Sequence, residues 1–142
     1  MSLDGGARIS TNAVFCGVSA PTTGAFPTVL VGSGSVSGIR SGKLTCEQVC
    51  GSLAAHMCSV DEYLRSAQLS LLTSLSGSYW IATGYWSTDG TITVRDCTAW
   101  SSASSGEKGL VIQTDMGGPG STFRAFPTAE TCNVSHSIMC CL

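Results

Sequence analysis

Apolar and polar positions define two helices in the first half of the chain. Ser59 and Glu62 form a capping box, in which each side chain accepts a hydrogen bond from the other residue's backbone N–H, and this marks the start of a helix. From there apolar residues recur at helical spacing and form one stripe: Val60, Tyr63, Leu64, Ala67 and Leu71. The pattern predicts an amphipathic helix from Val60 to Leu71 that buries this stripe.

A shorter helix is expected just before it, from Leu44 to Cys50. Cys46 and Cys50 are four residues apart, which places them on one helical face. Gly51 follows directly and supplies the left-handed conformation that commonly ends a helix.

The remaining pattern is β-prone runs between turn residues. These runs predict strands at 13–19, 28–31, 79–83, 110–113, 122–126 and 137–142. Asp89-Gly90 is the strongest hairpin signal, flanked by residues 85–88 and 91–94. Asp96-Cys97 and Trp100 open a loop expected from Ser101 to Gly109, within a longer loop region of roughly Trp86 to Phe126. We expect Trp80 and Trp100 to be buried, and Trp86 is the candidate for exposure.

The order of elements and the chain length indicate one α+β domain. A strand, two helices and then only strands and loops do not form alternating βαβ units. The 142 residues are enough for a single core, which we assign to residues 13–142, after a patternless N-terminal segment 1–12.

Charge and hydropathy exclude two classes of partner. Charged residues make up 11% of the chain and the net charge is −2, so no basic stripe is present to neutralise nucleic-acid phosphates. The apolar runs are far shorter than the roughly 20 residues that a membrane-spanning helix needs. We expect no nucleic acid and no membrane span.

Eight cysteines favour a disulfide framework and an oxidising compartment. They are Cys16, Cys46, Cys50, Cys58, Cys97, Cys132, Cys140 and Cys141. A zinc site from Cys46, Cys50, Cys58 and His56 is the competing interpretation, but paired CxxC knuckles are absent and the other cysteines are scattered. We expect all eight to be paired, with no metal, in a secreted or cell-surface protein.

The same residues resemble the C-type lectin-like fold. The resemblance rests on Cys50, Glu62, the run Trp80-Ile81-Ala82-Thr83-Gly84, Trp86, Cys97, Cys132 and Cys140, and it covers about residues 13–142. Ala82 departs from the usual "WIG" strand. More narrowly, Ala55-His56-Met57-Cys58, Asp96-Cys97-Thr98-Ala99-Trp100 and Cys140-Cys141 are similar to uncharacterised bacterial extracellular domains of that type. The resemblance implies two helices packed on small antiparallel sheets, with a long loop region and disulfide staples.

The resemblance also implies a disulfide pairing. It places one bond between the first helix and the last strand, from Cys50 or Cys46 to Cys140, and another from Cys97 to Cys132. Cys140 and Cys141 need different partners, because adjacent strand residues point to opposite faces. Cys16 then suits Cys141, and the remaining helix cysteine is left for Cys58.

The resemblance to the lectin-like fold does not extend to the motifs with which its members bind calcium and sugars. Calcium-dependent members carry a Glu-Pro-Asn or Gln-Pro-Asp tripeptide and a later Trp-Asn-Asp, and none is present here. Asp89, Asp96 and Asp115 are the candidate oxygen ligands of the loop region, and Trp86 is the candidate for sugar stacking. We expect calcium-independent binding and no cofactor.

Enzymatic activity is not expected. His56 with Cys58 or Ser59 is the candidate base and nucleophile, but the disulfide framework oxidises the thiol and no GxSxG elbow is present. The preferred interpretation is an extracellular recognition domain for a glycan or protein ligand. The alternative is a structural subunit of a fibre or surface assembly, a homo-oligomer or filament, because sparse charge weakens repulsion between copies.

Overall fold

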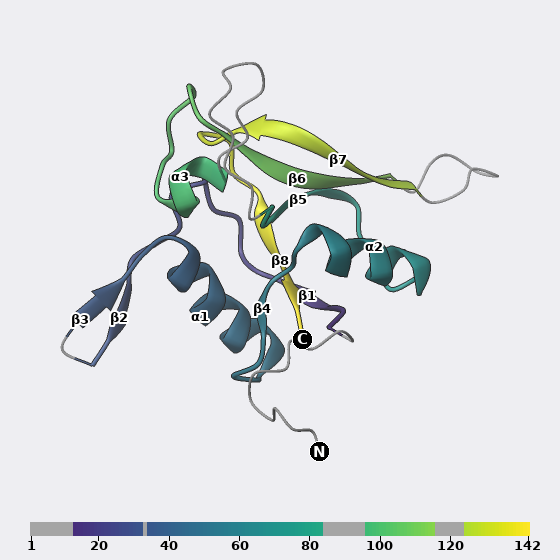
Figure 1. Cartoon of the computed structure of the whole chain (residues 1–142), viewed down its shortest axis with the longest axis horizontal. Helices are drawn as coiled ribbons and strands as arrows, with labels where there is room; N and C mark the ends of the chain where they lie inside the picture. The colour runs from purple at the N-terminus through teal and green to yellow at the C-terminus, as the bar shows by residue number, and fades with distance from the viewer. Residues whose placement is uncertain (1–12, 33, 84–95, 116–123) are drawn as a thin grey trace.

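The computed structural model describes residues 13–32, 34–83, 96–115 and 124–142 (Figure 1). In chain order the elements are β1 (Phe15–Val18), β2 (Val29–Val31), β3 (Gly34–Val36), α1 (Ile39–Cys50), β4 (His56–Met57), α2 (Val60–Gln68), β5 (Gly77–Ile81), α3 (Asp96–Trp100), β6 (Lys108–Asp115), β7 (Arg124–Thr131) and β8 (Ser137–Cys141). The mixture is α+β, as predicted. Within these residues no helix is long and apolar enough to cross a membrane.

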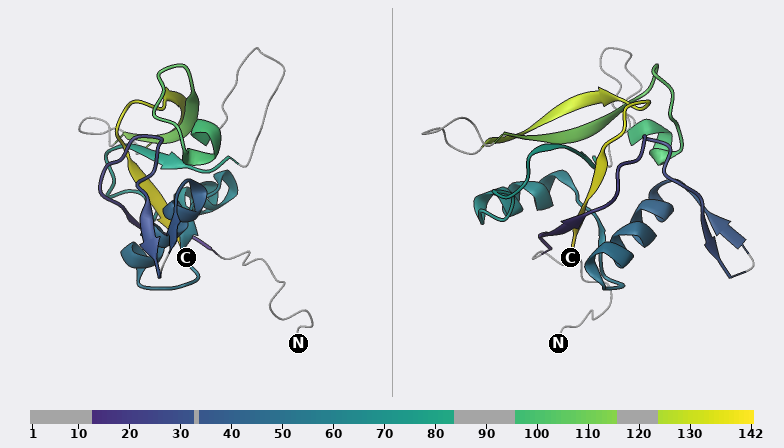
Figure 2. Two further views of the ribbon diagram at one scale, coloured as in Figure 1. Left: turned by 90° about the vertical axis from the view of Figure 1, so that its left-hand side faces the viewer. Right: turned by 180° about the vertical axis from the view of Figure 1, so that it is seen from behind.

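A six-stranded sheet organises the molecule. Its order is β1-β8-β5-β6-β7, and β4 pairs with β8 as well. β5 and β8 run parallel, with Tyr79 opposite Ser137, and the other pairs are antiparallel. β8 lies between α1 and α2 in Figure 1 and in the reverse view of Figure 2. The last strand is therefore the central element of the fold.

Alternate residues of β8 contribute to two separate hydrophobic cores. Ile138 and Cys140 belong to the core that also contains Trp80 and Trp100. Met139 and Cys141 belong to the second core, which also contains Tyr63, Leu72, Ile81 and Ile112. The burial of Trp80 and Trp100 confirms the prediction, and the alternation follows from the two-residue period of a strand.

Helix α1 ends where the sequence predicted but begins earlier. Gly51 has φ 66° and ψ 29°, the left-handed cap expected after Cys50. The helix starts at Ile39 rather than Leu44 because small residues in its first turns pack closely against the preceding segment. A Cβ on Gly42 would lie 2.9 Å from the Phe26 ring, and the Ser41 hydroxyl donates a hydrogen bond to the Pro27 carbonyl.

The capping box of α2 is present as predicted. The Glu62 N–H donates to Ser59 Oγ at 3.3 Å, and the Ser59 N–H donates to Glu62 Oε1 at 2.8 Å. The helix ends at Gln68, three residues earlier than predicted. Its buried residues are Tyr63 and Ser66.

The prediction that Leu64 and Leu71 are buried is wrong. Leu64 is 45% exposed and Leu71 is 40% exposed, whereas Leu72, beyond the end of the helix, is fully buried. The polar Ser66 determines which face packs inward, because its hydroxyl accepts a hydrogen bond from the Phe15 N–H at 2.8 Å. The spacing of apolar residues does not reveal this contact, because the residue that joins α2 to β1 is the polar Ser66.

The strands follow the predicted runs, with two additions. Residues 28–31 contain β2, which pairs with the unpredicted β3, and Gly32 between them has φ 59°. The two-residue strand β4 was also not predicted, since it depends on pairing with β8. The predicted run 110–113 lies within β6, and the described part of the run 122–126 lies in β7; the two strands pair over eight residues each. The predicted Asp89-Gly90 hairpin lies outside the described residues.

Residues 96–100, expected to begin a loop, form the left-handed turn α3. Asp96, Cys97, Thr98, Ala99 and Trp100 have φ from 46° to 62°. L-residues rarely adopt this conformation consecutively, because Cβ approaches the following carbonyl oxygen. No glycine in this run signals it.

All eight cysteines are paired, as predicted. The bonds are Cys16–Cys50, Cys46–Cys140, Cys58–Cys141 and Cys97–Cys132. The second and fourth agree with the pairing that the lectin-like resemblance implies. The predicted Cys16–Cys141 bond and the bond from a helix cysteine to Cys58 are wrong.

The register of β1 explains the exchanged partners. Phe15 pairs with Cys141 and Gly17 with Cys140, and the irregularity between them takes Cys16 out of the ladder. Cys16 then packs against the first core, the one that contains Trp80 and Trp100, and Cys50 packs against the same core. Cys141 faces the second core, which contains Cys58.

Candidate functional site

The four sequence-predicted binding residues are not assembled into one described site. Trp86 and Asp89 lie outside the described residues. Asp115 is the last residue of β6, where its backbone pairs with Arg124, and its side chain is outside the described part. Asp96 is therefore the one member whose side chain can be placed.

Asp96 is buried and anchors the backbone. Its carboxylate accepts hydrogen bonds from the Thr83 N–H, at 3.1 Å to Oδ2, and from the Thr83 hydroxyl, at 2.8 Å to Oδ1. Asp96 is the first residue of α3, and Thr83 follows the end of β5. These hydrogen bonds give both oxygens of the buried carboxylate a protein donor.

Two hollows outside the predicted loop region are candidates for ligand binding. The first, which we call the polar hollow, has a volume of about 210 Å³ and lies beside the starts of β5 and β8. Its lining residues are Pro21, Ser76, Gly77, Ser78, Tyr79, Ser135, His136 and Ser137. The parallel pairing of Tyr79 with Ser137 brings the two segments together.

Four serine hydroxyls of the polar hollow have no protein partner. In the described ranges, the side chains of Ser76, Ser78, Ser135 and Ser137 make no hydrogen bond. The Tyr79 hydroxyl donates to the Ser76 carbonyl at 3.0 Å, which fixes the direction of the phenol ring. Each free hydroxyl offers one donor and two acceptor lone pairs.

His136 also lines the polar hollow. Its ring lies edge-on to Trp80, with ring centroids 5.0 Å apart. Its Nε2 is buried without a hydrogen-bond partner among the described residues, and the nearest carboxylate oxygen, Glu130 Oε2, is 3.6 Å away. The backbone of His136 is held by two hydrogen bonds with Thr22, of 2.9 and 3.0 Å.

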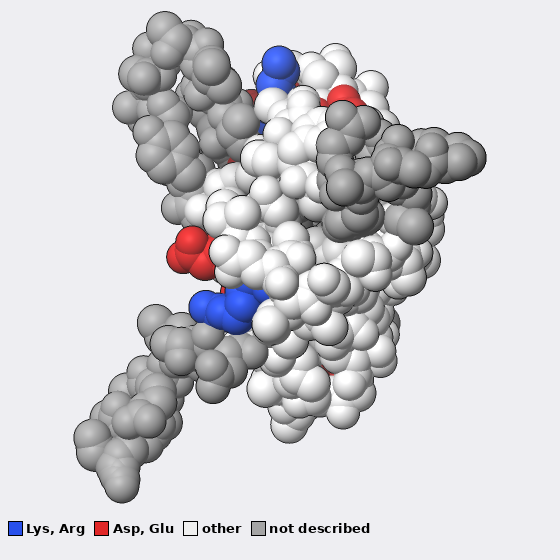
Figure 3. Space-filling model, turned by 90° about the vertical axis from the view of Figure 1, so that its right-hand side faces the viewer, with Lys and Arg blue, Asp and Glu red and all other residues white. Residues whose placement is uncertain are grey.

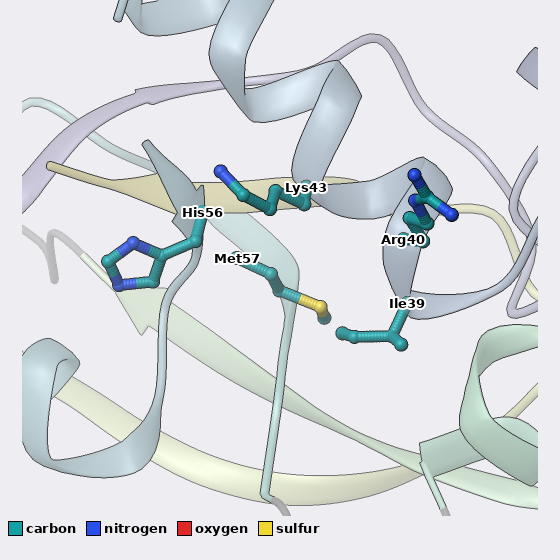
Figure 4. Close-up of a pocket in the computed structure, with 5 residues that line it drawn as sticks. All are labelled: Ile39, Arg40, Lys43, His56 and Met57. Carbon is teal, nitrogen blue, oxygen red and sulfur yellow. The ribbon is translucent and has the colours of Figure 1, made fainter. Parts of the chain in front are cut away.

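The second hollow, which we call the α1–β4 hollow, has a volume of about 360 Å³ (Figure 4). It is lined by Ile39, Arg40, Lys43, His56 and Met57. Figure 4 shows the Met57 side chain extending toward Ile39, with Arg40 and Lys43 rising from α1. The floor is apolar and the surrounding side chains are basic.

Two of the three basic side chains are already paired. Lys43 Nζ donates to Glu47 Oε1 at 2.8 Å and to the carbonyls of Leu53 and Ala55 at 2.8 and 3.2 Å. His56 Nε2 lies 2.6 Å from Glu62 Oε2.

His56 Nδ1 lies 3.0 Å from the Ala54 carbonyl oxygen, so both ring nitrogens have a protein partner. Arg40 is exposed and forms no hydrogen bond or ion pair with any residue that the structure describes.

The candidate catalytic pair is occupied by structural contacts. Cys58 is bonded to Cys141, and the Ser59 hydroxyl accepts the capping hydrogen bond from Glu62. Glu62 in turn contacts His56. The described ranges also hold no group of three or more His, Cys, Asp or Glu residues that could bind a metal ion.

No family model, curated protein or solved structure matches this chain. Its function must therefore be inferred from its own residues.

Sequence reasoning did not find either hollow. The polar hollow combines three segments, around residues 21, 76–79 and 135–137, which become neighbours through the parallel β5–β8 pairing. The α1–β4 hollow depends on β4, a strand too short to predict. The serines of the polar hollow and Arg40 of the α1–β4 hollow do not belong to any recognisable sequence motif.

Proposed function

We propose that this chain is an extracellular, non-enzymatic recognition domain that binds a neutral saccharide without calcium. The proposed binding site is the polar hollow. The observation that carries the proposal is that four serines whose side chains make no hydrogen bond within the described ranges line one hollow together with Tyr79. Saccharide hydroxyls are both donors and acceptors, so they match such a set of groups.

Size and charge support a small neutral ligand. The lining contains no Lys, Arg, Asp or Glu residue. The volume of about 210 Å³ is below the roughly 300–1,000 Å³ of pockets for drug-sized ligands, which favours a single sugar ring. A phosphate or sulfate ligand is best matched by Lys or Arg, and the lining contains neither.

The disulfide pattern supports a C-type lectin-like framework for this function. Cys46–Cys140 joins the first long helix to the last strand, and Cys97–Cys132 lies near α3. These are the two bonds that the sequence resemblance implies. Four disulfides in 142 residues favour a secreted or cell-surface location.

A glycan panel with the disulfide-intact protein tests the proposal. We expect retention on a subset of neutral glycans that is equal in millimolar calcium and in EDTA, and equal melting temperatures in both buffers. The variant Ser78→Ala with Ser137→Ala removes two hydroxyls, each contributing about 0.5–1.5 kcal/mol, so affinity should fall roughly 5- to 150-fold.

Ser105→Ala is the matched control, since Ser105 is an exposed serine outside the hollow. It should leave affinity unchanged. Binding that requires calcium, or equal affinity of the double variant and the native protein, would contradict the proposed site.

A structural subunit of an assembly remains the second candidate, and the β2–β3 hairpin favours it. The hairpin projects from the body of the molecule in Figures 1 and 2, and Leu30 is 82% exposed. Residues 28–38 contain no charged side chain. Figure 3 shows the side of the molecule away from the hairpin, and few charged side chains are visible there as well. Uncharged edge strands invite pairing with other copies.

Light scattering of the purified protein separates the two candidates. A binding domain stays monomeric as its concentration rises, whereas an assembly subunit grows into larger particles. If particles form, Leu30→Lys should suppress them, because a charge on an edge strand opposes pairing.

A further inference from the structure

We propose that the α1–β4 hollow binds an amphiphilic carboxylate, with its apolar body on Ile39 and Met57 and its carboxylate on Arg40. This inference goes beyond the proposed function, because the two hollows share no residue.

The hollow offers an apolar surface to solvent. Ile39 is the first residue of α1 and is 45% exposed. Covering this aliphatic side chain with an apolar ligand would be favourable, because it removes apolar surface from water. Met57 forms the floor and is itself nearly buried. A volume of about 360 Å³ lies within the range of ligand pockets, and methionine adapts its shape to different apolar ligands.

The charge around the hollow is unbalanced in favour of an anion. Glu47 is engaged by Lys43 and Glu62 by His56, so the carboxylates near the hollow are already in ion pairs or hydrogen bonds. Lys43 has three oxygen partners for its three N–H donors, so its ammonium group has no N–H left to bind a ligand. Arg40 is left without a partner in the described part of the chain.

The helix terminus adds to the attraction. Arg40 is in the first turn of α1, which contains no acidic residue, and the N-cap residue is Gly38, which has no side chain to cap the helix. The N-terminal end of a helix carries a partial positive charge that favours nearby anions. A guanidinium binds a carboxylate through two parallel N–H···O bonds, which a single free cation can supply.

Octanoate is the probe for this site, with 1-octanol and acetate as matched comparisons. Isothermal titration of the intact protein should detect binding of octanoate. The affinity for 1-octanol should be at least about tenfold lower, and acetate should not bind. The difference isolates the charged contact, and acetate tests whether charge alone suffices.

Two variants separate the parts of the site. Arg40→Gln should weaken octanoate roughly ten- to hundredfold and leave 1-octanol unchanged. Ile39→Ser should weaken both. Lys108→Gln, which removes an exposed cation from β6, is the control and should change neither. Melting curves establish that each variant is folded.

The outcomes distinguish this inference from the saccharide proposal. Equal affinity for octanoate and 1-octanol, or octanoate binding unaffected by Arg40→Gln, would overturn the carboxylate assignment. Absence of octanoate binding to the native protein would overturn the site itself. Glycan retention by Arg40→Gln should equal that of the native protein, whichever result is obtained.

Discussion

Asp96 holds Thr83 by three hydrogen-bond contacts, two to its N–H at 3.1 and 3.2 Å and one to its hydroxyl at 2.8 Å. The contact joins the end of the β5 segment to the beginning of α3, across the twelve residues 84–95. A residue that the sequence suggested as a calcium ligand therefore has a structural role in this fold.

Asp96→Ala should lower the free energy of unfolding by about 2–3 kcal/mol, because it removes charge-assisted hydrogen bonds from a buried site. Denaturant unfolding measures the change. Asp61→Ala is the control: Asp61 is exposed in the first turn of α2, so its loss should cost under about 1 kcal/mol. Similar losses for both variants would show that the Asp96–Thr83 contact contributes little.

Ala99→Gly should be neutral or stabilise the protein, whereas an Ala→Gly change in a right-handed helix is destabilising. Ala99 is exposed with φ 55°, where an L-residue costs roughly 1–2 kcal/mol relative to right-handed backbone. Glycine relieves that strain, offset by about 0.4–1 kcal/mol of added freedom in the unfolded chain. Thermal melts measure the result. Ala67→Gly in the right-handed helix α2 is the comparison and should destabilise by about 1 kcal/mol.

Leu72→Ala should cost about 2–5 kcal/mol, because Leu72 is fully buried in the second core. Leu64→Ala should cost much less, since nearly half of that side chain is exposed. Chemical denaturation of the two variants under identical conditions provides the measurement. A larger loss for Leu64 would restore the helix face expected from periodicity.

The disulfide pairing can be mapped in the variant Cys46→Ser with Cys140→Ser. Cleavage after Arg, Lys and Met then gives fragments 9–40, 44–57, 58–65 and 140–142, each with one cysteine. Mass spectrometry should find 9–40 joined to 44–57, and 58–65 joined to 140–142, because Cys16 bonds to Cys50 and Cys58 to Cys141. Fragment 9–40 joined to 140–142 would contradict this pairing.

Stability should fall at alkaline pH through Tyr63. Burial disfavours the charged phenolate and raises the pKa of Tyr63 above its usual value of 10.0. The unfolded state therefore loses this proton at a lower pH than the folded state, so stability declines as pH rises above about 10 and is unaffected below that. In Tyr63→Phe this part of the alkaline decline should disappear from denaturation curves measured between pH 9 and 11.

Local signals in the sequence predicted local structure well. The Ser59–Glu62 capping box and the Gly51 cap are formed by neighbouring residues, and both are present as predicted. The bond from Cys46 to Cys140 was one of two alternatives implied by the lectin-like resemblance. Opposite faces for Cys140 and Cys141 followed from strand geometry and are confirmed by their separate cores.

Features that depend on distant contacts were missed. Ser66 packs inward because the Phe15 N–H needs an acceptor, and Cys16 leaves the β1 ladder at an irregularity that no residue type announces. The turn at Asp96–Trp100 contains no glycine, so its left-handed backbone depends on tertiary contacts, among them the stacking of Phe26 on Trp100 with ring centroids 4.8 Å apart. Both hollows were missed for the same reason.

The adjacent positions of Cys140 and Cys141 constrain the order of events during biosynthesis. Of these eight cysteines they are synthesised last, and their partners Cys46 and Cys58 lie 94 and 83 residues earlier. A nascent chain exposed to oxidant can close Cys16–Cys50 early, but Cys46 and Cys58 must stay reduced, or be released from wrong partners by thiol exchange, until synthesis reaches the final strand. Cells that make this protein therefore need a disulfide isomerase or a delay in oxidation.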